Sequence, residues 1–400
     1  MKHIAEQTNK ACSGCGACAA LCPQNAIELR LDEAGFFRAQ VREERCVGCG
    51  LCRSVCERFS PAREGKDLRQ AELYALQSRN EETVLRCSSG GVAHELAADC
   101  LKQGVRVCGV IYDTESDRAM HRVVSSEKDL PALDGSKYLQ SDTGAFRQVL
   151  ARAQEGEQLA VFGTPCQIAG LARAAEALGV RDRLLLAEIF CHGVPSYLLW
   201  DRQCEKMKKK LHTDRFERVQ FRYKKNDWHS YCLRVDAAGR SYTGARETEL
   251  FWQVFFENVL LGDACSSCEL RKTASLADLR LGDYWGRRFQ QHSDGVSAAF
   301  ALTERGQRAL DRLELRRLDA GTPEEMLLAQ NMEGYRRRAL HDEAMAVLRQ
   351  TQDITQAVRF YRARDGKKQA LKRVLLRASA MIPDGLRARL RKANSSRKLK

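Results

Sequence analysis

The sequence predicts an α/β protein made of a small α+β module, a mixed, largely parallel α/β domain and a helical tail. Three observations predict it. Two cysteine-rich runs occupy residues 12–56, apolar strands alternate with helical stretches across residues 72–316, and Lys and Arg dominate residues 357–400. We expect a module over residues 1–60, a main domain over 63–320 with halves dividing near 200, and a basic helical extension over 321–400.

The cysteine runs repeat one spacing. Both read C-x2-C-x2-C-x3-C, the first ending at Cys22 and the second at Cys56. Bacterial two-cluster ferredoxins have this spacing, and the fourth cysteine of each run ligates the other cluster. The expected ligands are Cys12, Cys15, Cys18 and Cys56 for one 4Fe-4S cluster and Cys22, Cys46, Cys49 and Cys52 for the other. Structural zinc and disulfides are the alternatives, but zinc sites usually consist of two separated C-x2-C pairs.

Between the runs, residues 26–31 and 36–41 alternate as two short strands around the turn at residues 32–35, which predicts a hairpin. Pro61 and the charged residues Arg63, Glu64, Lys66 and Asp67 mark the boundary of the next domain.

Composition limits the class of protein. Nine of the 17 cysteines lie outside the runs without the pattern of a secreted disulfide protein, and the first ten residues lack the apolar core of a signal peptide. No apolar run reaches the ~18 residues that a membrane span needs. We therefore expect a cytoplasmic protein. Residues 357–400 hold fifteen Lys or Arg against two Asp, so the net charge of +14 belongs almost wholly to the tail.

The main domain opens with a small polar loop. Ser88-Ser89-Gly90-Gly91 precedes a helix predicted over residues 92–101, and the strand predicted over 105–112 follows. Backbone N–H groups of such a loop bind anions, although a simple helix N-cap explains the residues equally well. A G-x-G-x-x-G fingerprint is missing, which argues against an ordinary Rossmann NAD site.

Two predicted strands end in cysteine-containing loops. Residues 159–162 lead into Gly163-Thr164-Pro165-Cys166, where Thr164 suits a helix N-cap and Pro165 the first helical position. Residues 184–190 lead into Cys191-His192-Gly193. Ligands of parallel sheets bind beyond the carboxyl ends of the strands, but a single cysteine there is more often a small core residue. Cys265-x-x-Cys268 is half a metal site or a redox dithiol, and Cys166 and Cys191 can complete it.

The remaining elements are simpler. Residues 216–243 predict a hairpin turning at Gly239, 295–303 a strand and 304–316 a helix. Beyond Pro323 the chain is expected to be helical, with an apolar stripe of Leu371, Val374, Leu375, Ala378 and Ile382 flanked by Lys372, Arg373 and Arg377.

These motifs together resemble the beta subunit family of coenzyme F420 hydrogenase and dehydrogenase over about residues 1–320. The resemblance is carried by Ser88–Gly91, Gly135-Ser136-Lys137-Tyr138 with Ser141, Gly163–Gln167, Cys191–Ser196, and Cys265-x-x-Cys268 with Gly282-Asp283-Tyr284-Trp285-Gly286. Two features depart from the family pattern: Cys87 stands where a serine is expected, and the basic tail lies outside it.

The resemblance implies an FAD-binding iron–sulfur oxidoreductase. It implies flavin contacts from Ser88, Ser89, Gly90, Gly91, Ser136, Lys137, Tyr138, Ser141, Gly163, Thr164, Pro165 and Asp283. It also implies a third 4Fe-4S cluster, for which we predict the ligands Cys166, Cys191, Cys265 and Cys268. The candidates for catalytic groups are His192 and Lys137; the alternatives are a packed histidine bonded to a carbonyl and an exposed lysine. Asp283 either orients the flavin or caps a turn, and Trp228 and His229 are candidates to face the substrate.

The partners expected from the resemblance are ferredoxin or another redox protein, or a deazaflavin coenzyme. The alternative functions are a non-catalytic electron-transfer subunit that docks on a reductase, and a reductase associated with envelope polysaccharide biosynthesis. We expect the basic tail either to be a solvated tail or to bind an acidic partner or an anionic membrane, which would place the protein at the inner face of the membrane. We expect no specific binding of nucleic acid.

Overall fold

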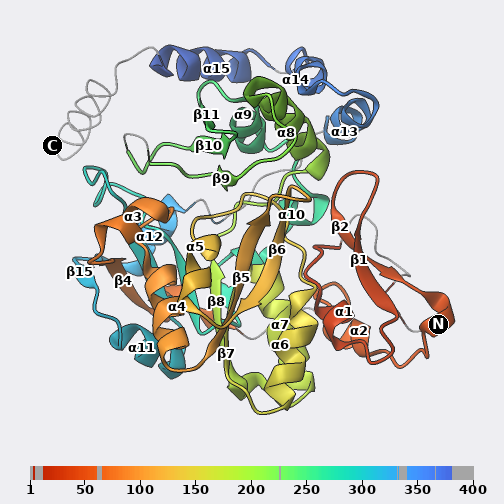
Figure 1. Ribbon diagram of the computed structural model, residues 1–400, viewed down its shortest axis with the longest axis vertical. Helices are drawn as coiled ribbons and strands as arrows, with labels where there is room; N and C mark the ends of the chain where they lie inside the picture. The colour runs from red at the N-terminus through yellow and green to blue at the C-terminus, as the bar shows by residue number, and fades with distance from the viewer. Residues whose placement is uncertain are drawn as a thin grey trace.

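The computed structural model describes residues 3–4, 12–60, 65–224, 227–330, 332, 340–364 and 366–380. Its largest element is an eight-stranded mixed sheet flanked by helices, so the predicted α/β class is confirmed (Figure 1). Pro61, Arg63, Glu64 and Ile382, which the sequence analysis singled out, lie outside the described residues.

The N-terminal module is built on one hairpin. Strands β1 (Ile27–Leu31) and β2 (Phe37–Val41) pair antiparallel, as predicted, and the short helices α1 (Ala17–Leu21) and α2 (Leu51–Ser54) each begin inside a cysteine run. Gly16 and Gly50 precede these helices with φ of 80° and 79°, a left-handed conformation that other residues rarely adopt. The two cysteine runs therefore fold as matching loop–helix turns.

The central sheet has the strand order β15-β4-β14-β13-β8-β7-β5-β6. In that order the strands are β15 (Arg316–Leu318), β4 (Glu72–Gln77), β14 (Ser297–Ala301), β13 (Leu279–Asp283), β8 (Leu184–Ile189), β7 (Leu159–Gly163), β5 (Arg106–Asp113) and β6 (Arg118–Val124). The four strands from β13 to β5 are parallel, and the pairings on either side are antiparallel. Parallel pairing is thus confined to the middle of the sheet, because hairpins add the strands β6 and β14.

Helices cover both faces of this sheet. α6 (Ala145–Gln154) and α7 (Pro165–Ala177) pack on the face that carries Leu159 and Val161, whereas α4 (Val92–Lys102) and α11 (Glu304–Asp311) pack on the face that carries Ala160. This alternation follows from the two-residue period of a strand. The helix predicted over residues 304–316 ends at Asp311, since Leu313 and Leu315 are buried in the same core as the chain approaches edge strand β15.

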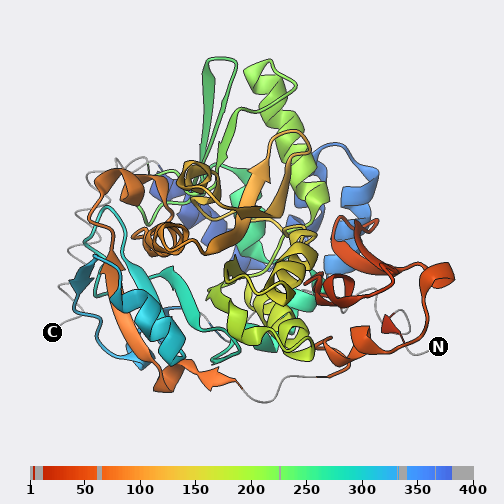
Figure 2. The same ribbon diagram turned by 60° about the horizontal axis from the view of Figure 1, so that its bottom comes forward.

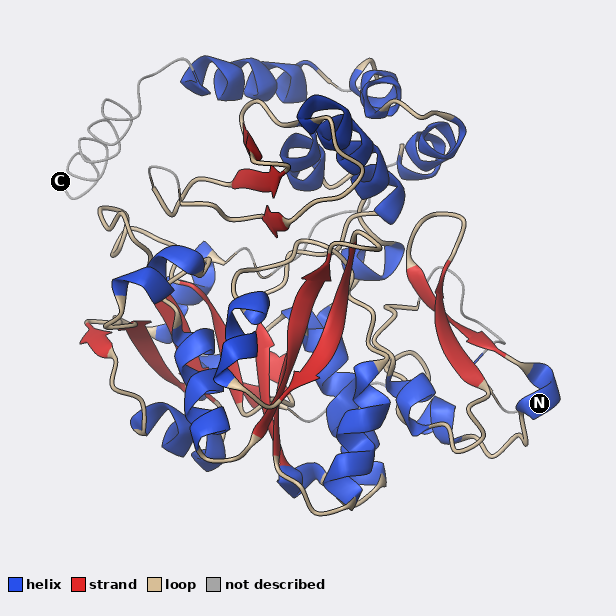
Figure 3. Cartoon of the chain, viewed as in Figure 1, coloured by secondary structure: helices blue, strands red, loops and turns tan. Residues whose placement is uncertain are grey.

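A second lobe lies beside the carboxyl end of the sheet, at the top of Figure 1 and Figure 3. Its sheet contains β9 (Arg218–Gln220), β10 (Cys232–Ala237) and β11 (Arg240–Ala245), and the predicted hairpin turns at Ala238 and Gly239. Its helices are α8 (Tyr197–Leu211), α9 (Leu250–Glu257), α13 (His341–Gln350) and α14 (Ile354–Arg362). One core that includes Trp200 and Trp252 joins them.

The C-terminal extension is only partly a tail. α12 (Pro323–Ala329) packs on the sheet domain, and α14 buries Ala357, Val358 and Tyr361 in the second lobe. α15 (Lys367–Ala380) lies at the edge of the molecule (Figure 1). Among the described residues, no helix combines the length and the apolar character that crossing a bilayer requires.

Candidate cofactor-binding and cluster site

A cavity of about 460 Å³ lies beyond the carboxyl ends of β7, β8 and β13. The loops that follow these strands line it, together with the Ser88–Gly91 loop, and the second lobe contributes Tyr231, Phe255 and Phe256. Its size falls within the ~300–1,000 Å³ typical of small-molecule sites, and its place in the sheet is the one expected for parallel strands.

The Ser88–Gly91 loop forms one wall of this cavity. The Ser136 N–H donates to Ser88 Oγ over 2.8 Å, and Ser89 Oγ donates to the Val296 carbonyl over 2.8 Å. The Gly90 N–H donates to Ser297 Oγ, and a Cβ at Gly90 would lie 2.8 Å from the Ser297 nitrogen. Gly90 is therefore wedged against the sheet and is not among the lining residues, unlike Ser88, Ser89 and Gly91.

Lys137 lines the same wall. The sequence left open whether it is a catalytic group or an exposed lysine, and in the structure it is only partly exposed. Its Nζ donates to the carbonyls of Ala132, Leu133 and Asp134 over 2.9–3.0 Å, at the end of α5 (Leu130–Leu133). Burial lowers the pKa of Lys137 to about 8. The cavity therefore has a cation that titrates close to neutral pH.

Four other predicted flavin contacts also line the cavity. The Tyr138 hydroxyl accepts from Arg222 Nη1 over 3.1 Å, and Ser141 Oγ accepts from Gln167 Nε2 over 2.8 Å. Gly163 and Thr164 line it at the end of β7. Thr164 is the N-cap of α7, as predicted, with its N–H donating to Gln167 Oε1. Pro165 is the first residue of that helix and is not among the lining residues.

The far wall carries a buried ion pair. The Asp283 carboxylate accepts from Arg222 Nη1 over 2.7 Å, and Arg222 also donates to the Trp228 carbonyl. Asp283 was predicted either to orient the flavin or to cap a turn. Its carboxylate pairs with Arg222 at the cavity wall, which is the arrangement expected for the first role. Trp228 is fully buried and stacks on Trp285 with ring centroids 5.0 Å apart. Neither Trp228 nor His229 is among the residues that line the cavity, and their predicted role of facing a substrate stays a prediction.

His192 also lines the cavity, at the end of β8. Its Nε2 lies 2.7 Å from Asn258 Oδ1, and its ring packs on Phe255. Burial lowers the pKa of His192, which keeps the imidazole neutral at neutral pH. These contacts match a packed histidine that satisfies a carbonyl, here a side-chain amide.

The four separated cysteines converge at one side of this cavity. Cys166 lies in the first turn of α7, and Cys191 lies two residues after the end of β8. Cys265 lies in the short helix α10 (Asp263–Ser266), and Cys268 follows that helix. Burial raises the pKa of Cys166, and its neighbours Cys268, Cys15 and Cys191 raise it further. Burial, together with Cys191 and Cys268, likewise raises the pKa of Cys265 to about 12.

Four neighbouring, partly buried thiolates repel one another, so all four can ionise only around a positive centre. An iron–sulfur core supplies that charge, and the donor set therefore fits a 4Fe-4S cluster. The ligand assignment itself stays a prediction.

A buried arginine holds the loop that carries two of these thiols. Arg280 in β13 pairs with Glu188 in β8, and both side chains are almost fully buried. The same guanidinium donates to the carbonyls of Leu270, Arg271 and Lys272, just after Cys268. The Arg271 side chain in turn donates to the His192 carbonyl over 3.1 Å, beside Cys191. These bonds tie the 265–272 segment to the ends of two parallel strands.

The module's cysteines divide into two sets. Cys15 and Cys18 have Cys12 and Cys56 among their electrostatic neighbours. Cys22, Cys46, Cys49 and Cys52 instead line a second, smaller cavity. This grouping agrees with the pairing inferred from the cysteine spacing.

The module docks directly beside the four separated cysteines. α1 packs on α7 at Gly170, where a Cβ would lie 2.9 Å from Ala17 Cβ and 3.1 Å from Cys15 Sγ. Gln140 bonds the Ser13 carbonyl and the Phe37 N–H, and Arg173 pairs with Glu57 over 2.9 Å. Because Cys15 is also an electrostatic neighbour of Cys166, the two cysteine groups adjoin at this contact.

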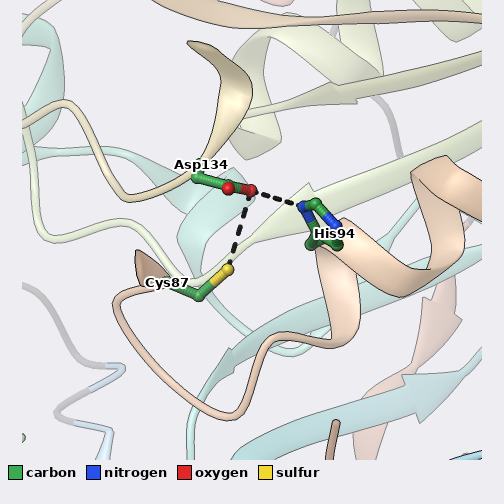
Figure 4. A group of neighbouring side chains, drawn as sticks. All are labelled: Cys87, His94 and Asp134. Carbon is green, nitrogen blue, oxygen red and sulfur yellow. Dashed lines mark hydrogen bonds and ion pairs between the residues drawn. The ribbon is translucent and has the colours of Figure 1, made fainter. Parts of the chain in front are cut away.

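One cluster of side chains was missed by the sequence analysis. Cys87, His94 and Asp134 meet at the cavity wall, where their ligand atoms all lie within 4.8 Å of one another (Figure 4). The only signal in the sequence was the cysteine at position 87, where the family resemblance led us to expect serine.

Two known protein families are similar to separate parts of the chain. Residues 11–58 match the 4Fe-4S dicluster domain, and residues 156–325 match the C terminus of the beta subunit of coenzyme F420 hydrogenase/dehydrogenase. The search of curated proteins found no match. A chain in a xenon-derivatised F420-reducing nickel–iron hydrogenase complex from Methanosarcina barkeri is similar with a TM-score of 0.46 and 16% identity, over 67% of this chain and 88% of that chain.

Proposed function

We propose that this chain is an iron–sulfur flavoprotein oxidoreductase. Its residues 156–325 match the C terminus of the coenzyme F420 hydrogenase/dehydrogenase beta subunit, and its residues 11–58 match a 4Fe-4S dicluster domain. Three 4Fe-4S clusters would carry single electrons between the protein surface and the cavity. FAD bound there would exchange electrons singly with clusters and in pairs with a substrate or carrier.

One observation carries this proposal: Cys191 belongs both to the group of four separated cysteines and to the cavity wall. On its other side that group adjoins Cys15 of the module. A path of cysteine groups therefore runs from Cys46–Cys52, through Cys12–Cys18, to the cavity. An isolated ferredoxin-like module would not need such a connection.

The cavity suits a large anionic cofactor. Ser88, Ser89, Gly91, Ser136, Tyr138, Ser141 and Thr164 would supply polar contacts, and Lys137 would supply positive charge. The first turn of α4 lies on the same wall, and helix N-termini favour phosphate groups. The aromatic side chains of the second lobe would exclude water from a bound ring.

Iron and flavin analysis of anaerobically purified protein tests the proposal. Three clusters give about twelve irons per chain and two give about eight, so eight irons in protein with intact module spectra would refute the third cluster. Cys268→Ser should lose about four irons while the module keeps its signal. Cys232→Ser is the matched control, since this buried thiol bonds the Leu233 carbonyl within β10 and belongs to no cysteine group.

The rival function is a non-catalytic subunit that passes electrons to a partner reductase. Reduced ferredoxin, reduced deazaflavin and NADH are added separately to the purified chain. Bleaching of the flavin without another protein supports the enzyme, whereas bleaching that requires a partner supports the subunit.

The edge of the molecule suggests where a partner or membrane binds. Leu371, Val374 and Leu375 of α15 are 60–61% exposed and recur at the spacing of one helix face. Twelve Lys or Arg accompany one Asp in residues 366–400. We propose that this segment binds an anionic surface, either an acidic redox partner or the inner face of the membrane.

A further inference from the structure

The cluster of Cys87, His94 and Asp134 is built from three separate elements. Cys87 is the C-cap of α3 (Glu81–Arg86), His94 lies in the first turn of α4, and Asp134 is the C-cap of α5. Figure 4 shows the three side chains pointing toward one another. All three border the cavity, yet Cys87 is only 8% exposed.

The Asp134 carboxylate is the centre of this cluster. Its Oδ1 lies 2.7 Å from His94 Nδ1 and 3.7 Å from Cys87 Sγ, while its Oδ2 accepts from Arg86 Nε over 3.0 Å. One carboxylate oxygen therefore faces the thiol and the imidazole, and the other accepts a hydrogen bond from Arg86. Lys137 fixes the backbone at the same residue by donating to the Asp134 carbonyl.

We propose that Cys87 Sγ, His94 Nδ1 and Asp134 Oδ1 bind one zinc ion at the cavity wall, with the fourth coordination position open to the cavity. Zinc favours this combination of sulfur, nitrogen and oxygen ligands. Three protein ligands with one open position are the pattern of exchangeable, catalytic zinc sites, whereas structural sites are closed by four. Arg86 would act as the outer partner that orients a ligating carboxylate.

The nearby cations do not oppose this site. Arg86, Lys137 and Lys224 surround Cys87 and Asp134. With zinc, the thiolate and the carboxylate balance the two charges of the ion. Because zinc binds the thiolate and not the thiol, its binding releases the thiol proton and strengthens as pH rises.

The open position identifies the class of ligand. A substrate oxygen or nitrogen that enters the cavity can coordinate the zinc, which polarises a carbonyl as a Lewis acid. The site rests on the three side chains alone and does not depend on the proposed flavin.

Metal analysis of the full chain with its clusters intact tests the site. Protein purified anaerobically is incubated with one equivalent of zinc, gel-filtered, and assayed for zinc and iron together. We expect one zinc per chain with iron unchanged. Zinc X-ray absorption should show one sulfur at ~2.3 Å and nitrogen or oxygen at ~2.0 Å. Failure to retain zinc, or a shell of four sulfurs from displaced iron, would overturn the proposal.

Variants separate a ligand role from a folding role, with iron content as the measure of folding. Cys87→Ser, His94→Gln and Asp134→Asn should each lose the zinc and keep the iron, and Arg86→Met should weaken zinc affinity by about 10–100-fold. The control is Cys100→Ser, because Cys100 lies on the same helix as His94 but in the core. If the ligand variants retain zinc as tightly as this control, the site is refuted. The iron count tests the cluster proposal separately.

Discussion

The two cysteine groups that adjoin at Gly170 are assembled in opposite ways. In the module, Cys12, Cys15 and Cys18 belong to one short run in which glycines with positive φ turn the chain. In the main domain, Cys166, Cys191 and the Cys265–Cys268 pair come from three separate loops. The first group takes three of its four expected ligands from one loop of the right spacing, whereas the second depends on the parallel sheet to bring three loops together. Thiols from distant segments can therefore converge where neighbouring strands end together.

The largest expected effect comes from removing the support of the second group. Arg280→Met leaves Glu188 as an unpaired buried charge, which should cost about 3–5 kcal/mol of stability. It also frees the carbonyls of residues 270–272, so the iron held beside Cys268 should be lost before the module's iron. Chemical denaturation and iron content measure both effects. Arg287→Met, at an exposed position nearby, is the control; equal stability of the two variants would contradict this role of Arg280.

A smaller effect is expected where the two groups meet. Gly170→Leu places a side chain against Ala17 and Cys15, and overpacking of this kind costs about 1–3 kcal/mol. Pushing the module away from α7 should slow electron transfer from the module to the cavity, measured by stopped-flow reduction, while the iron content stays constant. Ala177→Leu, exposed on the same helix, should change neither. Unchanged transfer in Gly170→Leu would show that the path does not cross this contact.

The cavity beside the second cysteine group should bind anions less tightly as pH rises. The pKa of Lys137 is about 8 because burial disfavours its charge. Below pH 8 the ammonium attracts an anionic ligand, and above pH 8 this attraction is lost, so the affinity for FAD or inorganic pyrophosphate should fall as pH rises through 8. Fluorescence or calorimetric titration from pH 6.5 to 9.5 measures the change. In Lys137→Arg, whose guanidinium stays charged, the fall should disappear. A wild-type affinity that is constant over this range would contradict the prediction.

The smallest effect on either cysteine group is expected from the basic tail. Deleting residues 366–400 removes the exposed apolar face of α15 and should abolish binding to phosphatidylglycerol vesicles, with iron content and stability nearly unchanged. Deletion from residue 357 would instead remove the buried side chains of Ala357, Val358 and Tyr361 and destabilise the second lobe. Vesicle binding by the shorter chain would refute the membrane role, and binding of an acidic protein alone would favour the redox partner.

Much of the fold could be predicted because its signals are local. The hairpin of the module, the strands β7 and β8 and the N-cap at Thr164 each depend on residues within one turn or strand. The antiparallel pairings on either side of the parallel strands were not predicted, since a strand's own residues carry little information about the direction of its neighbour. The helix expected to reach Arg316 ends at Asp311, because Leu313 and Leu315 are buried in the core before the chain pairs with β4 as strand β15. The helical pattern of the sequence does not indicate this tertiary contact.

By itself, the sequence determined the spacing of the module cysteines, the Ser88–Gly91 loop and where strands β7 and β8 end, because spacing along a chain restricts a loop or a helix cap directly. Only the tertiary structure decided that Cys166, Cys191, Cys265 and Cys268 meet, that Lys137 is held at the cavity wall by three carbonyls, and that Cys87 faces His94 and Asp134. Those contacts depend on the order of strands in the sheet. That order is set by the need to cover both faces of the sheet with helices. No single segment of the sequence specifies it, because it depends on how all the elements pack together.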